Sequence, residues 1–324
     1  MWQPTTYVAA LGLMLVSMVA WGSWDNTQKL ARWRFELFYW DYTWGIVVAA
    51  VVFGLALGNL SSLAQASPRA LAWAFVGGII WNLGNLLLVA AISIAGMALA
   101  FPVSSGLGLV IGGVLNYLIR PAGSPLWLFG GIALVCGAMA SVALAYRGLE
   151  HLRGHDHGTG SKGMTLSLAC GVVLGLYYPF AAKAMQGPGA LGPYAVLFVF
   201  VLGALASNFF FNGWFMRRPI HGAPVTWADY ARGAWPAHVW GVIGGVVWGI
   251  GTMASYIAAS TSFVGPATAY AMGGGNALIS ALWGVLIWKE FRGGDRHVGR
   301  LLALMFVLFI LGLMAIAVAP LKGM

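Results

Sequence analysis

The sequence predicts an all-α integral membrane protein of ten transmembrane helices, arranged as a 5+5 inverted repeat with both termini extracytoplasmic. Composition is the first observation: the 324 residues are 60% hydrophobic and 8% charged, and the mean hydropathy is +0.83. The second is a series of apolar runs of about 20 residues, long enough to cross a bilayer as helices. The third is a Gly-Gly-x-x-Trp-x-x-Gly pattern at 77–84 that recurs at 244–251.

The apolar runs favour helices over strands. Lipid cannot hydrogen-bond to backbone groups, so only helix bundles and closed barrels span a membrane. Because these runs are continuous rather than alternating, they indicate helices. We place the ten spans at residues 7–27, 42–60, 71–93, 97–119, 126–146, 163–183, 191–212, 237–260, 264–288 and 299–319.

The repeat extends beyond the glycine–tryptophan pattern. At an offset of 167 residues, these identical residues coincide: Ser93 with Ser260, Ala100 with Ala267, Gly106 with Gly273, Gly108 with Gly275, and Leu115 with Leu282. Tight hairpins also recur, because the third and fourth spans join around 95–96 and the eighth and ninth around 261–264. We expect a first five-helix repeat at 1–150, a cytoplasmic linker at 151–162 and a second repeat at 163–324.

The distribution of Lys and Arg predicts the orientation. Thirteen of them lie in the loops after the odd-numbered spans: Lys29, Arg32, Arg34, Arg147, Arg153, Lys162, Arg217, Arg218, Arg232, Lys289, Arg292, Arg296 and Arg300. The opposite side has four: Arg69, Arg120, Lys183 and Lys322. Cytoplasmic loops are the ones rich in Lys and Arg, so we place both termini outside a plasma (inner) membrane. Five helices per half is an odd number, so the second half enters the membrane inverted, an arrangement typical of transporters.

The linker and the cysteines offer other interpretations. The linker contains His151, His155 and His157, which could bind a metal, but the run is short and Gly-rich, so we favour a solvated linker. We predict no metal site and no cofactor. Cys136 and Cys170 lie in apolar runs, as packing residues or as a pair. The basic residues are confined to short loops, so no nucleic-acid partner is expected.

The end of the first span contains the one acid that we find within or close to a core segment. Trp21, Asp25 and Gln28 fall on one helical face. An acid in that setting must be paired, protonated or hydrated, so Asp25 is a candidate carrier of a coupling ion, with a proton as one version. The alternative is a helix-end residue at the interface, paired with Lys29 at i+4.

The third span combines an indole with two amides, Trp81, Asn82 and Asn85. Amides donate and accept hydrogen bonds and an indole packs against an apolar ring face, so the group suits a neutral polar ligand. The alternative is that the amides join helices to one another.

The fourth and ninth spans are rich in residues that interrupt helices. The fourth contains Pro102, Ser104, Ser105, Gly106, Gly108, Gly112, Gly113 and Asn116, and the ninth contains Pro266, Gly273, Gly274, Gly275 and Asn276. Interrupted helices at matching positions of two halves indicate a binding site, although small residues also serve close packing. The sixth span adds Tyr177 and Tyr178.

Enzyme signatures are missing from the sequence. We find no GxxxxGK[ST], HExxH or GxSxG pattern, so we do not expect an enzyme or an ATP-driven pump.

Several motifs resemble one group of transporters. Trp21-Gly22-Ser23-Trp24 followed by Asn26 and Lys29, YWDY at 39–42, Gly84-Asn85 with the Gly-rich segment to 115–117, and Trp288-Lys289-Glu290-Phe291 carry the likeness. Together with the ten-helix inverted repeat, they resemble the drug/metabolite transporter superfamily. Within it they are similar to the branch of glucose/ribose porters, rhamnose–proton symporters and ureide permeases. That branch often has Pro where this chain has Asp25.

The resemblance implies a secondary active transporter that works by alternating access on a small neutral polar solute. A sugar comes first and a ureide, nucleobase or nucleoside second, with protons as candidate coupling ions. The expected partners are the solute and membrane lipid, and the oligomeric state stays open. The candidate substrate-binding residues are Trp21, Trp24, Asn26, Trp81, Asn82, Asn85, Ser104, Asn116, Tyr177, Tyr178, Trp248, Tyr270 and Asn276. Two rivals remain: an exporter of drugs or amino acids from the same superfamily, and a membrane scaffold without transport.

Overall fold

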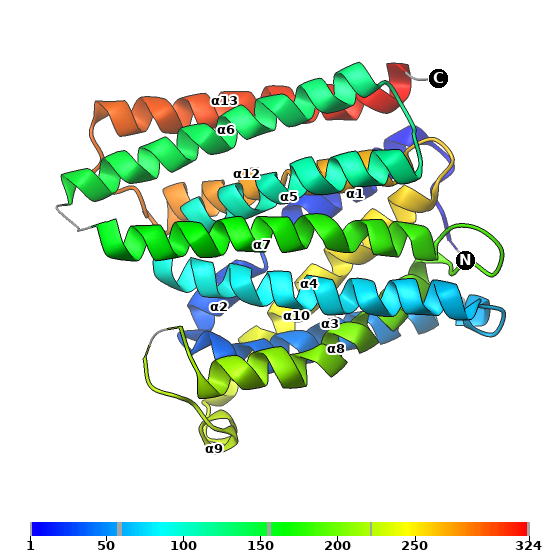
Figure 1. The fold of residues 1–324 in the computed structure, drawn as a ribbon, viewed down its shortest axis with the longest axis horizontal. Coiled ribbons are helices and arrows are strands. Elements are labelled where there is room, and N and C mark those ends of the chain that lie inside the picture. The colour runs from blue at the N-terminus through cyan, green and yellow to red at the C-terminus, as the bar shows by residue number, and fades with distance from the viewer. Residues whose placement is uncertain (1, 57–59, 154–156, 221, 323–324) are drawn as a thin grey trace.

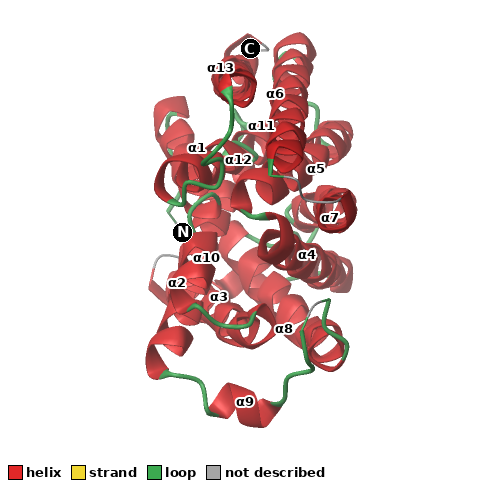
Figure 2. Cartoon of the chain, turned by 90° about the vertical axis from the view of Figure 1, so that its left-hand side faces the viewer, coloured by secondary structure: helices red, strands yellow, loops and turns green. Residues whose placement is uncertain are grey.

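The computed structural model describes residues 2–56, 60–153, 157–220 and 222–322, and in these residues the regular structure is all helical. The long helices lie side by side in one bundle (Figures 1 and 2). Within this described part of the chain, ten helical segments are long and apolar enough to cross a membrane. The predicted class, an all-helical integral membrane protein, is therefore confirmed.

The bounds of the helices follow the predicted spans closely. Two spans are made of shorter pieces: the first consists of α1 and α2, and the ninth of α11, α12 and the π-helical η2. The elements are α1 Tyr7–Trp21, α2 Asp25–Ala31, α3 Phe35–Ala56, η1 Leu60–Leu63, α4 Pro68–Ala95, α5 Met97–Ile119, α6 Pro125–Leu152, α7 His157–Ala184, α8 Pro193–Arg217, α9 Trp227–Ala231, α10 Trp235–Ser260, α11 Gly265–Gly273, α12 Asn276–Leu282, η2 Trp283–Ile287, α13 Arg296–Val318 and η3 Ala319–Lys322.

The second span starts earlier than predicted, at Phe35 instead of residue 42. The predicted bounds left Glu36 and Asp41 in the preceding loop, but both side chains are buried and paired. Glu36 binds Arg34 at 2.8 Å, and Asp41 accepts hydrogen bonds from Tyr230 and His238 at 2.6 and 2.8 Å. The prediction that Asp25 is the one acid in or close to a core segment is therefore wrong.

Two helices extend into the segment 151–162 that was predicted as a linker. Helix α6 continues to Leu152, which places His151 in its last turn, and α7 begins at His157. His155 lies outside the described residues, and so does the side chain of His157. Cys136 and Cys170 are unpaired thiols, which favours the interpretation as packing residues.

The repeated glycine–tryptophan pattern has the same packing role in both copies. The second glycine of each copy lies against the backbone of another helix. A Cβ atom on Gly78 would lie 1.9 Å from the carbonyl oxygen of Phe200 in α8, and one on Gly245 would lie 2.0 Å from that of Tyr42 in α3. No side chain fits at either position, so the pattern lets α4 and α10 approach their neighbours closely.

Helices from the two halves pack against each other throughout the bundle. Helix α1 contacts α10 and α4 contacts α7, while α3 packs on α10 and α4 on α8. At one edge of the bundle the last helix of each half, α6 and α13, lie together (Figures 1 and 2). Gly131 and Gly312 face each other there, since a Cβ on either one would lie within 3 Å of the other's carbonyl oxygen.

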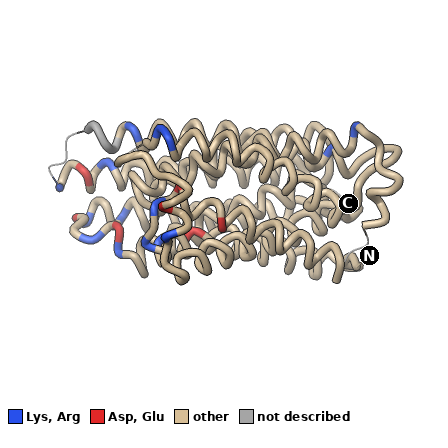
Figure 3. Tube along the Cα trace, turned by 90° about the horizontal axis from the view of Figure 1, so that it is seen from below, with Lys and Arg blue, Asp and Glu red and all other residues tan. Residues whose placement is uncertain are grey.

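The two ends of the bundle differ in charge. Lys and Arg gather at one end, and both chain termini lie at the other (Figure 3). We call these the basic end and the terminal end. The basic end contains contacts of Lys29 and Arg153 with residues 290–292, and the terminal end contains the contact between Gln3 and Ser260.

Candidate functional site

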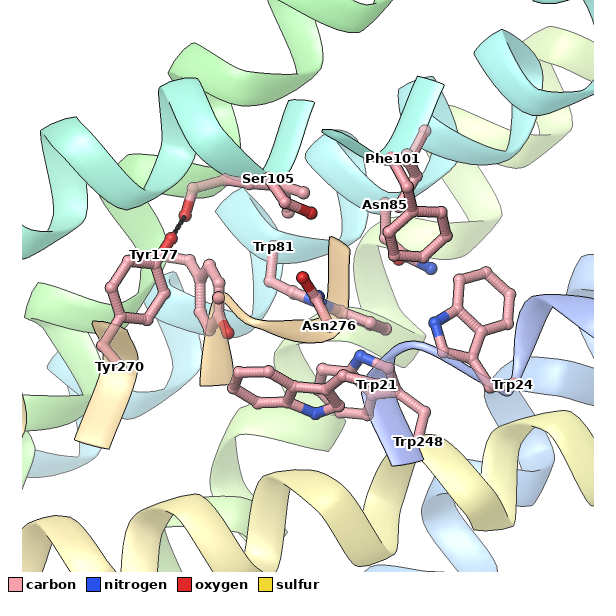
Figure 4. Close-up of a pocket in the computed structure, with 13 residues that line it drawn as sticks. Trp21, Trp24, Trp81, Asn85, Phe101, Ser105, Tyr177, Trp248, Tyr270 and Asn276 are labelled. Atoms are coloured by element: carbon pink, nitrogen blue, oxygen red, sulfur yellow. Dashed lines mark hydrogen bonds between the residues drawn. The ribbon is translucent and has the colours of Figure 1, made fainter. Parts of the chain in front are cut away.

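A cavity lies at the centre of the bundle, between the two halves (Figure 4). Its volume is about 50 Å³, which holds a few water molecules. Helices of both halves line it, with these residues: Trp21, Trp24, Trp81, Asn85, Leu88, Phe101, Ser105, Leu174, Tyr177, Trp248, Tyr270, Gly274 and Asn276.

Four indoles dominate the wall of the cavity. Trp81 and Trp248, the tryptophans of the two pattern copies, meet with ring centroids 4.1 Å apart, and Trp21 stacks beside Trp248 at 6.3 Å. Trp24 packs against Tyr42, with ring centroids 4.5 Å apart. Ring packing of this kind holds large flat side chains in fixed orientations, so the wall offers a rigid aromatic surface.

The polar groups of the cavity are uncharged. Asn85 donates a hydrogen bond from Nδ2 to Tyr39 Oη at 3.1 Å. Asn276 lies among the indoles (Figure 4), and its Oδ1 is buried and accepts no hydrogen bond from the described residues. A buried acceptor without a donor is costly, so a ligand that donates to Asn276 would recover that free energy. Because no Lys, Arg, Asp or Glu lines the cavity, it suits a neutral ligand.

The glycine-rich fourth span serves packing around a tyrosine. Tyr270 Oη donates to the carbonyl oxygens of Gly108 and Leu174, each at 3.2 Å, and so joins α11 to α5 and α7. A Cβ on Gly112 would lie 2.3 Å from the Tyr270 ring. Helix α5 is continuous in spite of Pro102, so the predicted interruption of this span is wrong.

The structure brings many of the predicted residues to this cavity. Those that line it are Trp21, Trp24, Trp81, Asn85, Tyr177, Trp248, Tyr270 and Asn276. Those that lie elsewhere are Asn26, Asn82, Ser104, Asn116 and Tyr178.

The residues outside the cavity are held by other parts of the protein. Asn82 accepts from Tyr39 Oη at 3.0 Å and donates to Ser207 Oγ at 2.9 Å, so it joins α4 to α3 and α8. The other hydrogen bonds are Trp288 Nε1 to Asn26 Oδ1 at 2.6 Å, Asn116 Nδ2 to Gly112 O at 2.7 Å, and Tyr178 Oη with Ser255 Oγ at 2.8 Å. Ser104 is fully buried within α5.

Sequence reasoning missed the lining residues Leu88, Phe101 and Leu174, and it named Ser105 and Gly274 only as residues that interrupt helices. Helical spacing could have predicted some of them, because they share a helix face with a predicted lining residue or with each other. Trp81, Asn85 and Leu88 follow at i, i+4 and i+7, which separates Asn85 from Asn82. Phe101 and Ser105 are likewise one turn apart on α5.

Asp25 is fully buried at the start of α2. Its Oδ2 accepts a hydrogen bond from Ser280 Oγ at 3.3 Å, while its Oδ1 has no partner among the described residues. Lys29 pairs with Glu290 and not with Asp25. The alternative of an interfacial Asp25–Lys29 pair is therefore wrong.

The two broken spans meet beside the cavity. Helix α1 ends at Trp21 and α2 begins at Asp25, and the break between α11 and α12 lies at Gly274 and Gly275. A Cβ on Gly22 would lie 2.5 Å from the carbonyl oxygen of Asn276. Broken helices that meet at the centre of a membrane bundle free backbone groups for a ligand or an ion.

Comparisons with known proteins agree with this architecture. The model of the Ureide permease family matches residues 162–320. Ureide permease 1 of Arabidopsis thaliana is 23% identical, over 93% of this chain and 94% of its own length. A putative sugar uptake protein of Lactiplantibacillus plantarum is 24% identical over 86% and 89%, and a probable glucose uptake protein of Bacillus anthracis is 23% identical over 83% and 87%.

The fold also has a solved counterpart. A protein crystal structure matches with a TM-score of 0.63 at 17% identity, over 95% of this chain and 96% of that one. At this identity the likeness shows the fold alone.

The described residues form ten apolar helices around a central cavity, and the relatives are permeases and uptake proteins. Together these findings define an integral membrane protein of the transporter class rather than an enzyme. More narrowly, the chain is related to the ureide permeases and to the bacterial sugar uptake proteins. The resemblance predicted from the sequence is thereby confirmed.

Proposed function

We propose that the protein is a secondary active transporter of a small neutral polar solute, with a sugar as the first substrate class and a ureide, nucleobase or nucleoside as the second. The central cavity carries this proposal. Its indoles offer a flat apolar surface, its amides offer hydrogen bonds, and it has no charge to bind an ion-like substrate. Relatives named for ureides and for glucose support both substrate classes.

The proposed architecture is a first repeat at 1–150, a linker at 151–162 and an inverted second repeat at 163–324. The helix contacts support it, because the main contacts of α4 and α10 correspond when the halves are exchanged. The pair α1–α10 corresponds to α7–α4, and α3–α10 corresponds to α8–α4. The basic end belongs in the cytoplasm of a plasma (inner) membrane, with both termini outside.

Transport follows by alternating access. The cavity is too small for a sugar ring, so the halves must move apart on one side to admit one. Since helices of both halves line the cavity, rocking one half against the other would expose it to each side in turn.

Asp25 is the proposed proton carrier. Its carboxyl group is fully buried, one oxygen accepts a hydrogen bond from Ser280, and the other has no hydrogen-bond partner among the described residues. An acid inside a membrane bundle is a candidate site for binding and releasing a proton when a path to water opens. Its position beside the break of the first span places it close to the cavity, where substrate and proton could bind in one conformation.

Purified protein in liposomes tests the proposal. A thermal-shift screen against sugars, ureides, nucleosides and drugs would first select ligands, because a ligand of the native state raises its stability. We expect uptake or exchange of a polar solute that Asn276→Ala and Asn85→Ala weaken. Asn116→Ala, an amide outside the cavity, is the matched control.

Two results would contradict this reading. Transport of lipophilic drugs that is unchanged in both cavity variants would favour an exporter. No transport of any selected solute, with or without a pH gradient, would favour a scaffold.

A further inference from the structure

We propose that Arg120 and Glu290 are the gating residues of the transport cycle, each closing one end of the central cavity by binding the backbone of a hairpin in the other half. This inference rests on the proposed function as a transporter. It assigns a role to two charged residues that do not line the central cavity.

At the basic end, the contact is made by Glu290. This residue follows η2, and its Oε1 accepts a hydrogen bond at 3.2 Å from the backbone nitrogen of Met97, the first residue of α5. Lys29 at the end of α2 pairs with the same carboxylate. A carboxylate at a helix N-terminus is favoured by the helix dipole. Glu290 therefore fastens the ninth span to the α4–α5 hairpin of the other half.

The hairpin is shaped to receive this carboxylate. Gly96, between α4 and α5, has a φ of 78°, a conformation that disfavours other residues. A Cβ on Gly96 would lie 3.0 Å from Glu290 Oε2. A glycine is thus required both for the turn and for the close approach of the acid.

At the terminal end, the contact is made by Arg120 directly after α5. Its guanidinium donates to the carbonyl oxygens of Ala259 and Thr261, at 3.5 and 3.2 Å. These carbonyls end α10 and begin the hairpin to α11, which turns at Gly265 with a φ of 75°. A cation at a helix C-terminus is again the charge that the helix dipole favours. Arg120 therefore fastens the fourth span to the α10–α11 hairpin.

The two contacts are counterparts under exchange of the halves. Arg120 ends the fourth span and binds the hairpin before the ninth, while Glu290 ends the ninth span and binds the hairpin before the fourth. Each is followed three residues later by a glycine of positive φ, Gly123 and Gly293. The charges are opposite because one contact meets a helix C-terminus and the other a helix N-terminus.

Each contact also borders a cavity that opens at its own end of the bundle. Glu290 and Gly96 line one of about 630 Å³, with Glu150 and Arg153. Arg120 and Ser260 line another of about 200 Å³, with Gln3 and Pro266. The helices joined by these contacts, α5, α10 and α11, also line the small central cavity. Breaking one contact would let the cavity at that end extend to the centre.

Labelling of a cysteine in the central cavity from either side tests the assignment. The reporter is Ser105→Cys in a protein with Cys136→Ala and Cys170→Ala, treated with a membrane-impermeant thiol reagent in right-side-out and inverted vesicles. Glu290→Gln should raise the labelling rate from the basic end about tenfold, as expected for one lost charge-assisted hydrogen bond. Arg120→Gln should do the same from the terminal end. Each variant should slow labelling from the opposite side.

Matched controls come from the same ends. Glu150→Gln removes a neighbouring acid of the basic end that pairs with Arg153 at 3.7 Å, and Arg69→Gln removes an exposed cation. Neither should change labelling from either side. If Glu290→Gln does not fold, Lys29→Gln weakens the same contact and should act in the same direction.

The gating role is overturned if both variants change labelling in the same direction, or if neither changes it. The readout needs no substrate. A failure of the gates therefore leaves the proposed substrate class standing, and a failed transport assay leaves the labelling result intact.

Discussion

The two copies of the Gly-Gly-x-x-Trp-x-x-Gly pattern have the same packing role but differ in their polar surroundings. In both, the second glycine lies against a neighbouring backbone and the tryptophan reaches the centre of the bundle. One turn later the copies differ. Asn85 of the first copy lines the cavity. Thr252 of the second copy does not line it, and its hydroxyl accepts a hydrogen bond from Trp21 Nε1 at 2.9 Å. The comparison teaches that the two copies share their packing but not their polar groups.

The largest expected effect concerns the shared packing role. Gly78→Leu and Gly245→Leu should each lower the free energy of unfolding by more than about 3 kcal/mol, because the new side chain meets a backbone that cannot move aside. We expect no folded protein by size-exclusion chromatography and thermal melting in detergent. Gly130→Leu is the control, since a Cβ there meets nothing within 4 Å. A tolerated substitution in one copy alone would break the equivalence of the two.

The next effect concerns the two broken spans, of which the first has an acid, Asp25, directly after its break. Asp25→Asn should abolish accumulation of solute against its gradient and spare exchange of solute across the membrane, because the substrate site remains but the proton carrier is lost. Ser280→Ala, on the other broken span, should retain accumulation at a reduced rate. Gradient-driven uptake and counterflow in liposomes measure the two activities. Undiminished accumulation by Asp25→Asn would exclude this residue as the carrier.

A smaller effect separates the two amides of the first copy. Asn85→Ala should raise the KM for a polar substrate about tenfold or more, since a hydrogen bond that specifies the ligand is lost. Asn82→Ala should instead lower the melting temperature, because the two hydrogen bonds that join α4 to α3 and α8 are lost. If Asn82→Ala weakens substrate binding at unchanged stability, the assignment of Asn82 to helix packing is wrong.

The smallest effect concerns the second copy. Thr252→Val removes the hydrogen-bond partner of Trp21 and keeps the volume of the side chain. Since the indole still stacks on Trp248, we expect a change in KM of about threefold, consistent with the loss of one neutral hydrogen bond. A loss as large as that of Asn85→Ala would mean that the second half binds the substrate as strongly as the first.

Much of the fold could be predicted from the sequence because apolar length alone identifies a membrane helix. The errors occurred where polar residues are paired inside the protein. The start of α3 was predicted too late, because Glu36 and Asp41 looked too polar for a membrane helix. Their partners Arg34, Tyr230 and His238 are recognised only in the folded chain.

The candidate site was predictable in its indoles and less so in its polar residues. The repeated pattern places a tryptophan at the centre in both halves. An amide can bind either a ligand or a neighbouring helix, and which of these it faces depends on the packing of the folded chain. Helical spacing could distinguish Asn85 from Asn82 only once Leu88 was known to face the cavity. The Glu290 and Arg120 contacts depend on hairpins far away in the sequence, which no local pattern contains.

The contact of Gly131 with Gly312 constrains how the protein can move. At this edge the backbones of α6 and α13 touch, with no side chains between them that could change rotamer and open a gap. We expect this pair to act as the rotation axis of the cycle. Distances between spin labels placed across α6 and α13 would then stay constant between conformations, while those across the opposite edge, at α3 and α8, would change most.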